Sequence, residues 1–121
     1  IARRRAIARR YDAAFAGLAE VQPLKVDYAA VAPHIYIVRV PEGRRDAFME
    51  FLKARGVGTG LHYIANHIQP FFKKYARGPL PRAEKLWQEI VTIPLHCALS
   101  DQDVETVVAA VTEFCKSRTA A

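Results

Sequence analysis

The residues best suited to chemistry gather in one stretch, residues 56–70, which reads GVGTGLHYIANHIQP. Four polar side chains follow its apolar, glycine-punctuated start: His62, Tyr63, Asn66 and His67. Imidazole, phenol and amide groups supply hydrogen-bond donors and acceptors that suit hydroxyls or phosphate oxygens. Loops that leave a strand end often hold ligand contacts in α/β domains. From these residues alone, a substrate-binding loop and a merely structural loop explain the stretch equally well.

The spacing of the histidines and cysteines argues against metal or thiol chemistry. His62 and His67 are five residues apart, so they do not share a helical face, and no acid lies between them as in a zinc-protease helix. His96 and Cys97 would complete a ligand set only if the fold happened to bring them there. Adjacency of these two in sequence does not make a base and nucleophile pair. The segment GVGTG also lacks the spacing of a phosphate-binding loop or a dinucleotide fingerprint.

Length and composition predict a small globular domain. The chain has 121 residues, 51% hydrophobic and 25% charged, which suffices for one compact core and argues against disorder. No apolar run approaches the roughly 20 residues of a membrane span. Two cysteines make no disulfide framework, so a reducing, cytoplasmic setting is expected. The chain begins with Ile1 and its single methionine is Met49, which leads us to expect a piece of a longer protein.

The net charge of +6 comes mostly from one cluster near the start of the chain. This arginine cluster consists of Arg3, Arg4, Arg5, Arg9 and Arg10. Such a cluster attracts phosphate backbones without sequence-specific chemistry, so a free-standing nucleic-acid-binding module is one alternative. RNA readers interleave stacking aromatics with their basic residues, and this cluster has none. The preferred interpretation is a helix face that is solvated or meets acidic groups of a missing portion, with nucleic acid an unlikely partner.

Hydrophobic periodicity and turn residues predict alternating helices and strands. The expected helices cover residues 1–20, 44–55, 70–75, 81–90 and 101 to the end. The expected strands cover 34–40, 57–63 and 90–94, with an irregular connector at 21–33. Gly56 sits where a left-handed C-terminal cap belongs, and Ser100 with Asp103 resembles a capping box.

A helix between strands 34–40 and 57–63 makes these two strands parallel, joined by a right-handed crossover. If strand 90–94 lies between them, antiparallel to both, the arrangement is a split βαβ unit. The expected fold class is therefore α/β (α+β), a small three-stranded mixed sheet with helices packed on it. The side chains expected to pack on the helices are Ile7, Tyr11, Phe15, Leu18, Ala47, Phe48, Phe51, Leu52, Phe71, Phe72, Tyr75, Ala83, Leu86, Trp87, Ile90, Val104, Val107, Val108, Val111, Phe114 and Cys115.

Several segments in consistent order resemble one known family. They are the Arg- and Ala-rich helix ending at Tyr11, HIYIVRV, GVGTGLHY, NHIQPFFKKY and LPRAEKLWQEIVTIPLHCALSDQDVETVVAAV. Together they resemble the C-terminal small domain of the DegT/StrS-type sugar-nucleotide aminotransferases. The resemblance implies the small domain of a fold-type I enzyme, usually a homodimer, that uses pyridoxal phosphate. Such an enzyme moves an amino group from an amino acid, typically glutamate, to a keto-sugar on a nucleotide, as in polysaccharide biosynthesis.

The resemblance also implies roles for parts of this chain. Residues 1–20 would be the connecting helix from a large domain and residues 21–121 the small domain. His62, Tyr63 and His67 would be substrate-side contacts, although Ile64 and Ala65 stand where the family often has prolines. None of the lysines matches the family's cofactor-binding motif, so the fragment is expected to bind no cofactor and to be inactive alone. A catalytically dead interaction domain is a further alternative.

Overall fold

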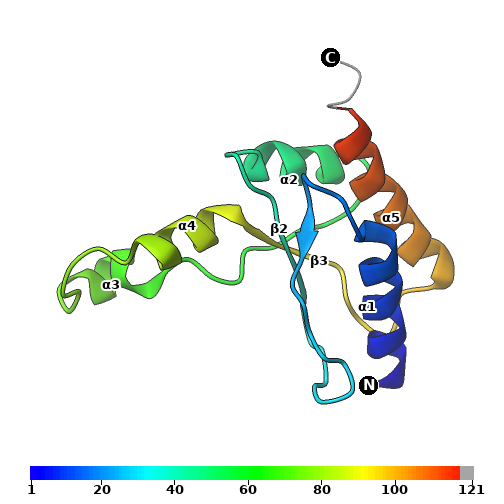
Figure 1. The fold of residues 1–121 in the computed structure, drawn as a ribbon, viewed down its shortest axis with the longest axis horizontal. Coiled ribbons are helices and arrows are strands. Elements are labelled where there is room, and N and C mark those ends of the chain that lie inside the picture. Colours follow the sequence, from blue (N-terminus) through cyan, green and yellow to red (C-terminus); the bar gives the residue numbers. More distant parts are fainter. Residues whose placement is uncertain (118–121) are drawn as a thin grey trace.

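A three-stranded antiparallel sheet in the order β1-β2-β3 lies at the centre of the computed structural model, which describes residues 1–117 (Figure 1). The strands are β1 (Gln22–Pro23), β2 (Tyr36–Arg39) and β3 (Ile90–Ile93). The helices are α1 (Ala2–Phe15), α2 (Arg45–Lys53), α3 (Pro70–Lys73), α4 (Pro81–Glu89) and α5 (Asp101–Lys116), with a 3-10 turn η1 (Asn66–Ile68). The expected class, α/β with helices packed on a small sheet, is confirmed.

The strand expected at residues 57–63 is wrong as a strand. Only Gly60 pairs there, through an isolated antiparallel bridge to Thr92 of β3. Glycine alternates with other residues in this segment and leaves few side chains to stabilise a ladder. Since Gly60 and β2 are both antiparallel to β3, the segment around Gly60 runs parallel to β2, with β3 between them as in the expected split arrangement.

The third strand of the sheet comes instead from β1, inside the expected irregular connector. Gln22 pairs with Arg39 and Pro23 with Val38, antiparallel. The hydrogen-bonded sheet is therefore antiparallel rather than mixed. Two residues, one of them a proline, carry no readable period, which is why the sequence pattern does not reveal this strand.

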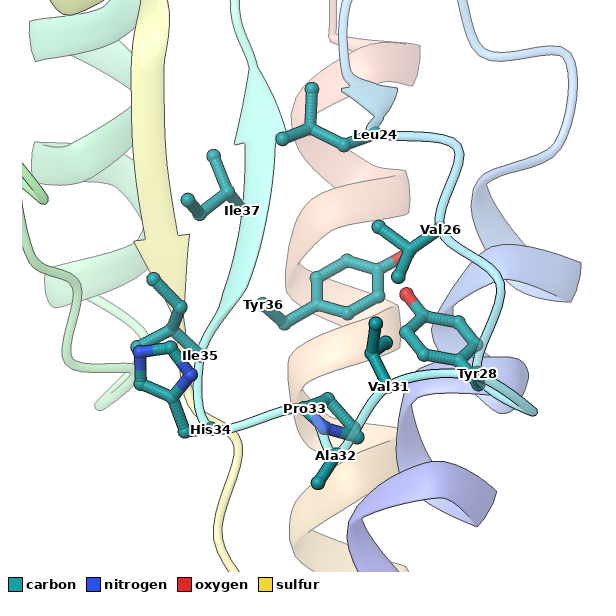
Figure 2. A pocket seen from close by; sticks show the side chains of 10 residues that line it. All are labelled: Leu24, Val26, Tyr28, Val31, Ala32, Pro33, His34, Ile35, Tyr36 and Ile37. Atoms are coloured by element: carbon teal, nitrogen blue, oxygen red, sulfur yellow. The ribbon is translucent and has the colours of Figure 1, made fainter.

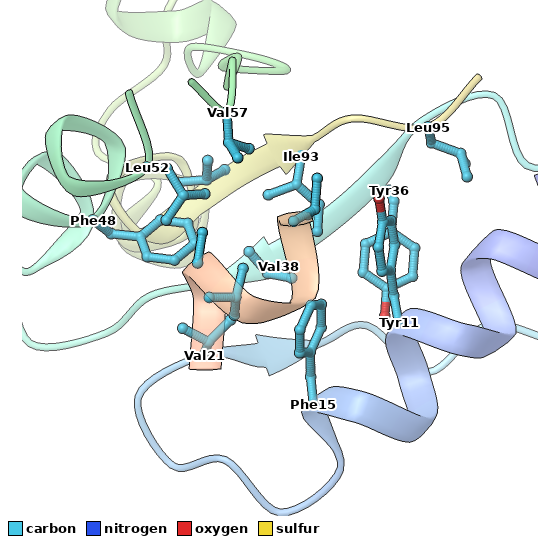
Figure 3. Packing of buried hydrophobic residues seen from close by; sticks show 14 of the residues in the cluster. Tyr11, Phe15, Val21, Tyr36, Val38, Phe48, Leu52, Val57, Ile93 and Leu95 are labelled. Carbon is cyan, nitrogen blue, oxygen red and sulfur yellow. The ribbon is translucent and has the colours of Figure 1, made fainter. Parts of the chain in front are cut away.

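One face of the sheet packs on α1, α2 and α5 (Figures 1 and 3). Alternation along the strands sends Val38, Val91 and Ile93 into this core, with relative exposures of 0%, 0% and 1%. The opposite face of β2 and β3 is only half-buried. Figure 3 shows Tyr11 and Phe15 of α1 and Phe48 and Leu52 of α2 closing over the buried face. The sheet thus has one face committed to folding and one face open for other contacts.

The helix ends follow their glycines and caps. α1 ends at Phe15, earlier than expected, because Gly17 adopts φ 80° and turns the chain. Gly56 after α2 has φ 73°, as its position predicted. The capping box of α5 is complete, since the Ser100 hydroxyl accepts from the backbone N–H of Asp103 and the Asp103 carboxylate accepts from the N–H of Ser100.

The segments η1, α3 and α4 form an arm that projects from the body of the molecule (Figure 1). No side chain between residues 61 and 88 is buried. The expectation that the aromatic residues of segment 70–75 pack is wrong, since Phe71, Phe72 and Tyr75 are 68%, 42% and 66% exposed. The arm is a single layer, and nothing among residues 1–117 covers its apolar side chains, Leu86 of α4 among them. Ala47, on the body, is also exposed rather than packed.

The arm joins the body at a buried carboxylate, Glu89, whose relative exposure is 6%. Its Oε2 accepts hydrogen bonds from Nε and Nη2 of Arg39 on β2, the former at 3.1 Å. Nearby, Nη1 of Arg45 donates to the carbonyl of Trp87 at 3.0 Å and its guanidinium lies over the Trp87 ring. A buried charge of this kind is stabilised by its partner, so these two arginines hold the root of the arm in place.

Candidate functional site

His62 is held against the open face of the sheet by three neighbours. Its Nδ1 lies 2.9 Å from the hydroxyl oxygen of Thr92, a hydrogen bond whose direction depends on the tautomer. The ring also lies close over Gly60, because a Cβ built there would be 2.9 Å from Cε1 of His62. The ring of Tyr63 meets it edge-on, with ring centroids 4.9 Å apart. His62 is therefore a half-buried, fixed imidazole rather than a freely rotating surface side chain.

A groove of about 320 Å³ opens beside this imidazole. Its lining includes His34, Ile35, Thr59, His62, Thr92 and Pro94. Two imidazoles and two hydroxyls offer both donors and acceptors there. Within residues 1–117, Nε2 of His62 makes no hydrogen bond, so it is the nitrogen available to a ligand. The groove can accept hydroxyl or phosphate oxygens, and it holds no acid–base pair or nucleophile aimed at a common point.

The sequence-predicted site residues do not all meet at this groove. Tyr63 lies at the side of His62 and is 72% exposed, so its phenol is free to reach a partner. His67 lies in the arm, where its Nε2 is 2.9 Å from a carboxylate oxygen of Glu84. The same oxygen accepts from the N–H of Leu80, also at 2.9 Å. These two bonds hold the pKa of Glu84 below its ordinary value and join η1 to α4.

Two residues of the groove were not anticipated as site residues. Thr92 faces it because Val91 and Ile93 on either side point into the core. That alternation was readable in the short run IVTI, where the only polar residue falls on the face opposite its buried neighbours. His34 precedes β2 and is exposed at the groove. Its position depends on how the loop before β2 folds, and periodicity says nothing about such a loop.

A second hollow of about 250 Å³ lies between the loop before β2 and the strand itself (Figure 2). Its lining is mostly apolar, with Leu24, Val26 and Ile37 among the side chains in Figure 2. Its two phenols, Tyr28 and Tyr36, lie with their hydroxyls close together in Figure 2. Both phenols are buried, and that of Tyr36 is hydrogen-bonded within the fold, so the hollow offers little to a polar ligand.

Asp12 of α1 is the shared partner of the two phenols. The hydroxyl of Tyr36 donates to its Oδ1 at 2.6 Å, and the charge of this carboxylate also acts on the phenol of Tyr28. Burial, reinforced by the Asp12 charge, raises the pKa of Tyr28 to about 12 and raises the pKa of Tyr36 further. Burial alone raises the pKa of Tyr11 to about 12, and its hydroxyl donates to the carbonyl of Pro94 at 3.0 Å. These phenols stay protonated and tie α1 to the sheet.

The arginine cluster is largely engaged within the chain. Arg3 donates to the carbonyl of Leu99 and pairs with Asp101 at 2.7 Å. Arg5 donates to backbone carbonyls of the loop before β2. Arg10 makes a two-bond pair with Glu105 of α5, both bonds 2.7 Å long. The acidic and carbonyl partners thus belong to this chain, and the cluster fastens α1 to its neighbours.

The remaining candidate groups do not form a reactive centre. Cys97 is exposed and Cys115 is buried in the core, where burial raises its thiol pKa to about 11. In the described part of the chain, no group of three or more His, Cys, Asp or Glu side chains is placed to hold a metal ion. No helix within residues 1–117 has the length and apolar character needed to cross a membrane.

Comparison with solved structures places this fold among the aminotransferases. TlmJ from Streptoalloteichus hindustanus is 34% identical over 100% of this chain, with a TM-score of 0.86, and S. venezuelae DesV is 31% identical over 94%, with a TM-score of 0.82. Spr1654 from Streptococcus pneumoniae, described as a sugar aminotransferase and solved in PMP and PLP forms, is 26% identical over 96%, with a TM-score of 0.85. The model of the DegT/DnrJ/EryC1/StrS aminotransferase family matches residues 1–112, and the chain belongs to this family.

The chain is much shorter than these structures. It covers 33% of the TlmJ chain and 31% of the DesV and Spr1654 chains. About a third of such an enzyme is therefore represented by residues 1–121. The resemblance seen in the sequence is confirmed at the level of family and fold.

Proposed function

We propose that this chain is the C-terminal small domain of a pyridoxal-phosphate-dependent aminotransferase acting on a nucleotide-linked keto-sugar. The amino donor is an amino acid, glutamate, and the small domain contributes one wall of the sugar-nucleotide site. Residues 1–20 connect it to the large domain and residues 21–121 form the small domain. The observation that carries the proposal is the fixed His62 beside an open groove, in a chain of the DegT/DnrJ/EryC1/StrS family.

The groove suits the polar part of such a substrate. His62 offers Nε2 and Tyr63 offers its phenol, which can hydrogen-bond sugar hydroxyls or diphosphate oxygens. The net charge of +6 favours the approach of an anionic diphosphate. We infer an indirect role for His67 in substrate binding. Its bond to Glu84 keeps η1 and α4 together, and η1 follows His62 and Tyr63 in the chain.

The cofactor belongs elsewhere in the enzyme. A lysine that carries pyridoxal phosphate sits in an enclosed site, whereas every lysine of this chain is solvent-exposed. The lysines are Lys25, Lys53, Lys73, Lys74, Lys85 and Lys116. None of them fits the role of the lysine that carries the cofactor, so no step of the reaction is assigned to these lysines. When bound, pyridoxal phosphate supplies the electron sink of amino-group transfer, and this chain binds and orients the sugar side.

Two further features complete the proposal. The enzyme is a homodimer, as the resemblance to its family implies, and neither the apolar surface of the arm nor the groove is closed by this chain alone. It works in the cytoplasm, in keeping with two cysteines that remain free thiols. A nucleic-acid-binding module is disfavoured because Arg3, Arg5 and Arg10 already have partners within the chain.

The test uses the full-length enzyme with a panel of dTDP-, UDP- and GDP-linked keto-sugars and glutamate. His62→Ala and Tyr63→Phe are each expected to raise the KM for the sugar nucleotide about tenfold, since each removes one hydrogen bond to it, and to change the KM for glutamate by less than about twofold. Tyr75→Phe is the matched control, because Tyr75 is 66% exposed and Tyr63 is 72% exposed. Unchanged sugar-nucleotide kinetics in both site variants would remove these residues from the site. A gene with no upstream cofactor lysine would contradict the wider proposal.

A further inference from the structure

We propose that Thr92 is a positioning residue for His62. Its hydroxyl fixes the plane of the imidazole and leaves Nε2 as the nitrogen that contacts the sugar nucleotide. The inference rests on the proposed function, in which His62 contacts this substrate. It adds a residue on β3 to a site that the sequence pattern assigned only to the segment after Gly60.

Backbone hydrogen bonds alone align the segment that carries His62 with Thr92. The N–H of Gly60 donates to the carbonyl of Thr92 at 2.9 Å, and the N–H of Thr92 donates to the carbonyl of Gly60 at 2.8 Å. This reciprocal pair fastens the segment at one point of β3. Because side chains alternate along a strand and Val91 and Ile93 fill the core, the Thr92 hydroxyl must face the groove. His62 lies two residues beyond the fastened glycine, within reach of that hydroxyl.

The imidazole is then confined from two further sides. Its Cε1 occupies the space where a Cβ of residue 60 would lie, since that Cβ would come within 2.9 Å of it. The Tyr63 ring stands nearly perpendicular to it, at an interplanar angle of 83°. Sterics therefore restrict where the ring lies, and the bond from Nδ1 to Thr92 decides which edge points away from the strand. The edge that remains free carries Nε2.

A hydroxyl partner has a particular consequence for the protonation of His62. A hydroxyl both donates and accepts, so Thr92 can accept from a protonated Nδ1 or donate to an unprotonated one. A carboxylate in its place would hold a proton on Nδ1 and dictate the role of Nε2. Thr92 fixes the orientation of the ring while leaving Nε2 able to donate to a phosphate oxygen or to accept from a sugar hydroxyl.

The experiment is a double-mutant cycle in the full-length enzyme, with the same panel of dTDP-, UDP- and GDP-linked keto-sugars. Thr92→Val keeps the shape and removes the hydroxyl, and is expected to raise the sugar-nucleotide KM about tenfold with little change in the KM for glutamate. Thr92→Ser retains the hydroxyl and is expected to stay within about twofold of the wild type. Thr106→Val is the control, because the hydroxyl of Thr106 donates to the carbonyl of Gln102 within α5, at 2.9 Å.

The decisive measurement is Thr92→Val in an enzyme that already carries His62→Ala. If Thr92 acts through His62, the second substitution adds less than about twofold to the KM. An equal effect of Thr92→Val with and without His62 would overturn the inference, as would a loss in Thr92→Ser equal to that in Thr92→Val. An effect of His62→Ala without any effect of Thr92→Val overturns this inference alone. No effect of His62→Ala removes His62 from the proposed site and overturns the inference with it.

Discussion

Gly60 is required by a side chain rather than by its own backbone. Its φ lies outside the left-handed region, yet a Cβ at this position would be 2.9 Å from Cε1 of His62. Gly60→Ala is therefore expected to displace the imidazole and break its bond to Thr92. For the proposed sugar-nucleotide aminotransferase, we predict an increase of about tenfold in the KM for its sugar substrate, the effect of losing one hydrogen bond. The melting temperature should change by only a few degrees, since the core is untouched.

Gly58→Ala is the matched control for this prediction. Gly58 lies in the same segment, and a Cβ there would meet nothing within 4 Å. The same substitution at this position should leave the position of the His62 ring unchanged. A KM for Gly60→Ala equal to that for Gly58→Ala would contradict the steric role of residue 60, because it would mean that the ring moves at no cost.

The tyrosines around Asp12 predict a dependence of stability on alkaline pH. The pKa values of Tyr11 and Tyr28 are raised to about 12, by burial first of all. A phenol whose pKa in the folded state exceeds its unfolded value of about 10 stabilises the folded state fully below pH 10. This stabilisation is lost as pH rises towards 12. The free energy of unfolding, measured with urea at a series of pH values, should therefore fall between pH 10 and 12.

Tyr36→Phe tests the same cluster at neutral pH. It removes the 2.6 Å bond to the Asp12 carboxylate and should lower the free energy of unfolding by about 1.5–3 kcal/mol, as expected for a hydrogen bond to a charged group. The alkaline fall should also become shallower. Tyr75→Phe, at an exposed position, should change neither quantity. A Tyr36→Phe protein as stable as the wild type would mean that Asp12 is satisfied by Tyr28 or water alone.

At the scale of elements, the link between η1 and α4 depends on one carboxylate. Glu84 accepts from His67 and from the Leu80 N–H, and its pKa is lowered by these bonds. Glu84→Gln should speed hydrogen exchange in residues 64–80 and leave the exchange of α5 unchanged, since the pair lies in the arm and outside the apolar core. A carboxyl group whose pKa is lower in the folded state stabilises that state fully above its unfolded pKa. This stabilisation is lost as pH falls through the folded pKa. In the wild type, protection of the Leu80 amide should therefore decrease below about pH 4.5.

Lys85→Gln is the control for this effect. It removes a neighbouring charge of α4, whose Nζ lies 3.9 Å from Glu89, without touching the link to His67. Equal exchange in the two variants would show that the link does not hold the arm together.

Elements with a clear period were predictable from the sequence, and so was the cap of α5. The stripe of Val104, Val107 and Val111 is buried as expected, and Ser100 caps the helix with Asp103. The strand predictions that failed concern segments whose structure depends on pairing with another strand. β1 has only two residues, and the strand expected at 57–63 is reduced to a bridge because its alternating glycines leave few side chains to stabilise pairing with β3.

The same distinction applies to the site and to the arm. His62 and Tyr63 could be singled out because polar rings after an apolar run are unusual, but the partner of His62 lies 30 residues away on β3 and could not be read from spacing. Phe71 and Tyr75 have the composition of core residues, yet they are exposed. The type of a side chain shows that it is apolar enough to be buried. It does not show whether another element of the chain packs on it.

At the scale of the whole molecule, the structure divides into a stabilised body and a weakly anchored arm. The body joins α1, α2, α5 and the sheet through one apolar core (Figure 3). The arm contributes no buried residue between 61 and 88 and is fixed mainly at its root, by Arg39 and Arg45. The groove is lined by β3, by the loop before β2 and by the segment around Gly60, so the rigid strand β3 lies behind His62.

This division predicts where a protease cuts first. Local opening needs the least free energy where few apolar contacts are buried, and the arm presents Lys73, Lys74 and Arg77 at exposed positions. Limited trypsin digestion of the 121-residue chain should therefore cut at these three residues before any site in α1 or α5. Mass spectrometry of the first fragments reads out the order.

A variant with Lys73→Gln, Lys74→Gln and Arg77→Gln should lose these first cuts and survive longer under the same conditions, because the other arm sites, Arg82 and Lys85, lie within helix α4 and the body opens only at a higher free energy. Replacing Arg9, an exposed arginine of α1, by Gln is the matched control and should leave the first cuts unchanged. First cleavage in α1 or α5 would contradict the division, since it would mean that the body opens before the arm. In the full-length enzyme, slower cutting at Lys73 and Lys74 than in this chain is the expected result if the rest of the enzyme covers the aromatic side chains of α3.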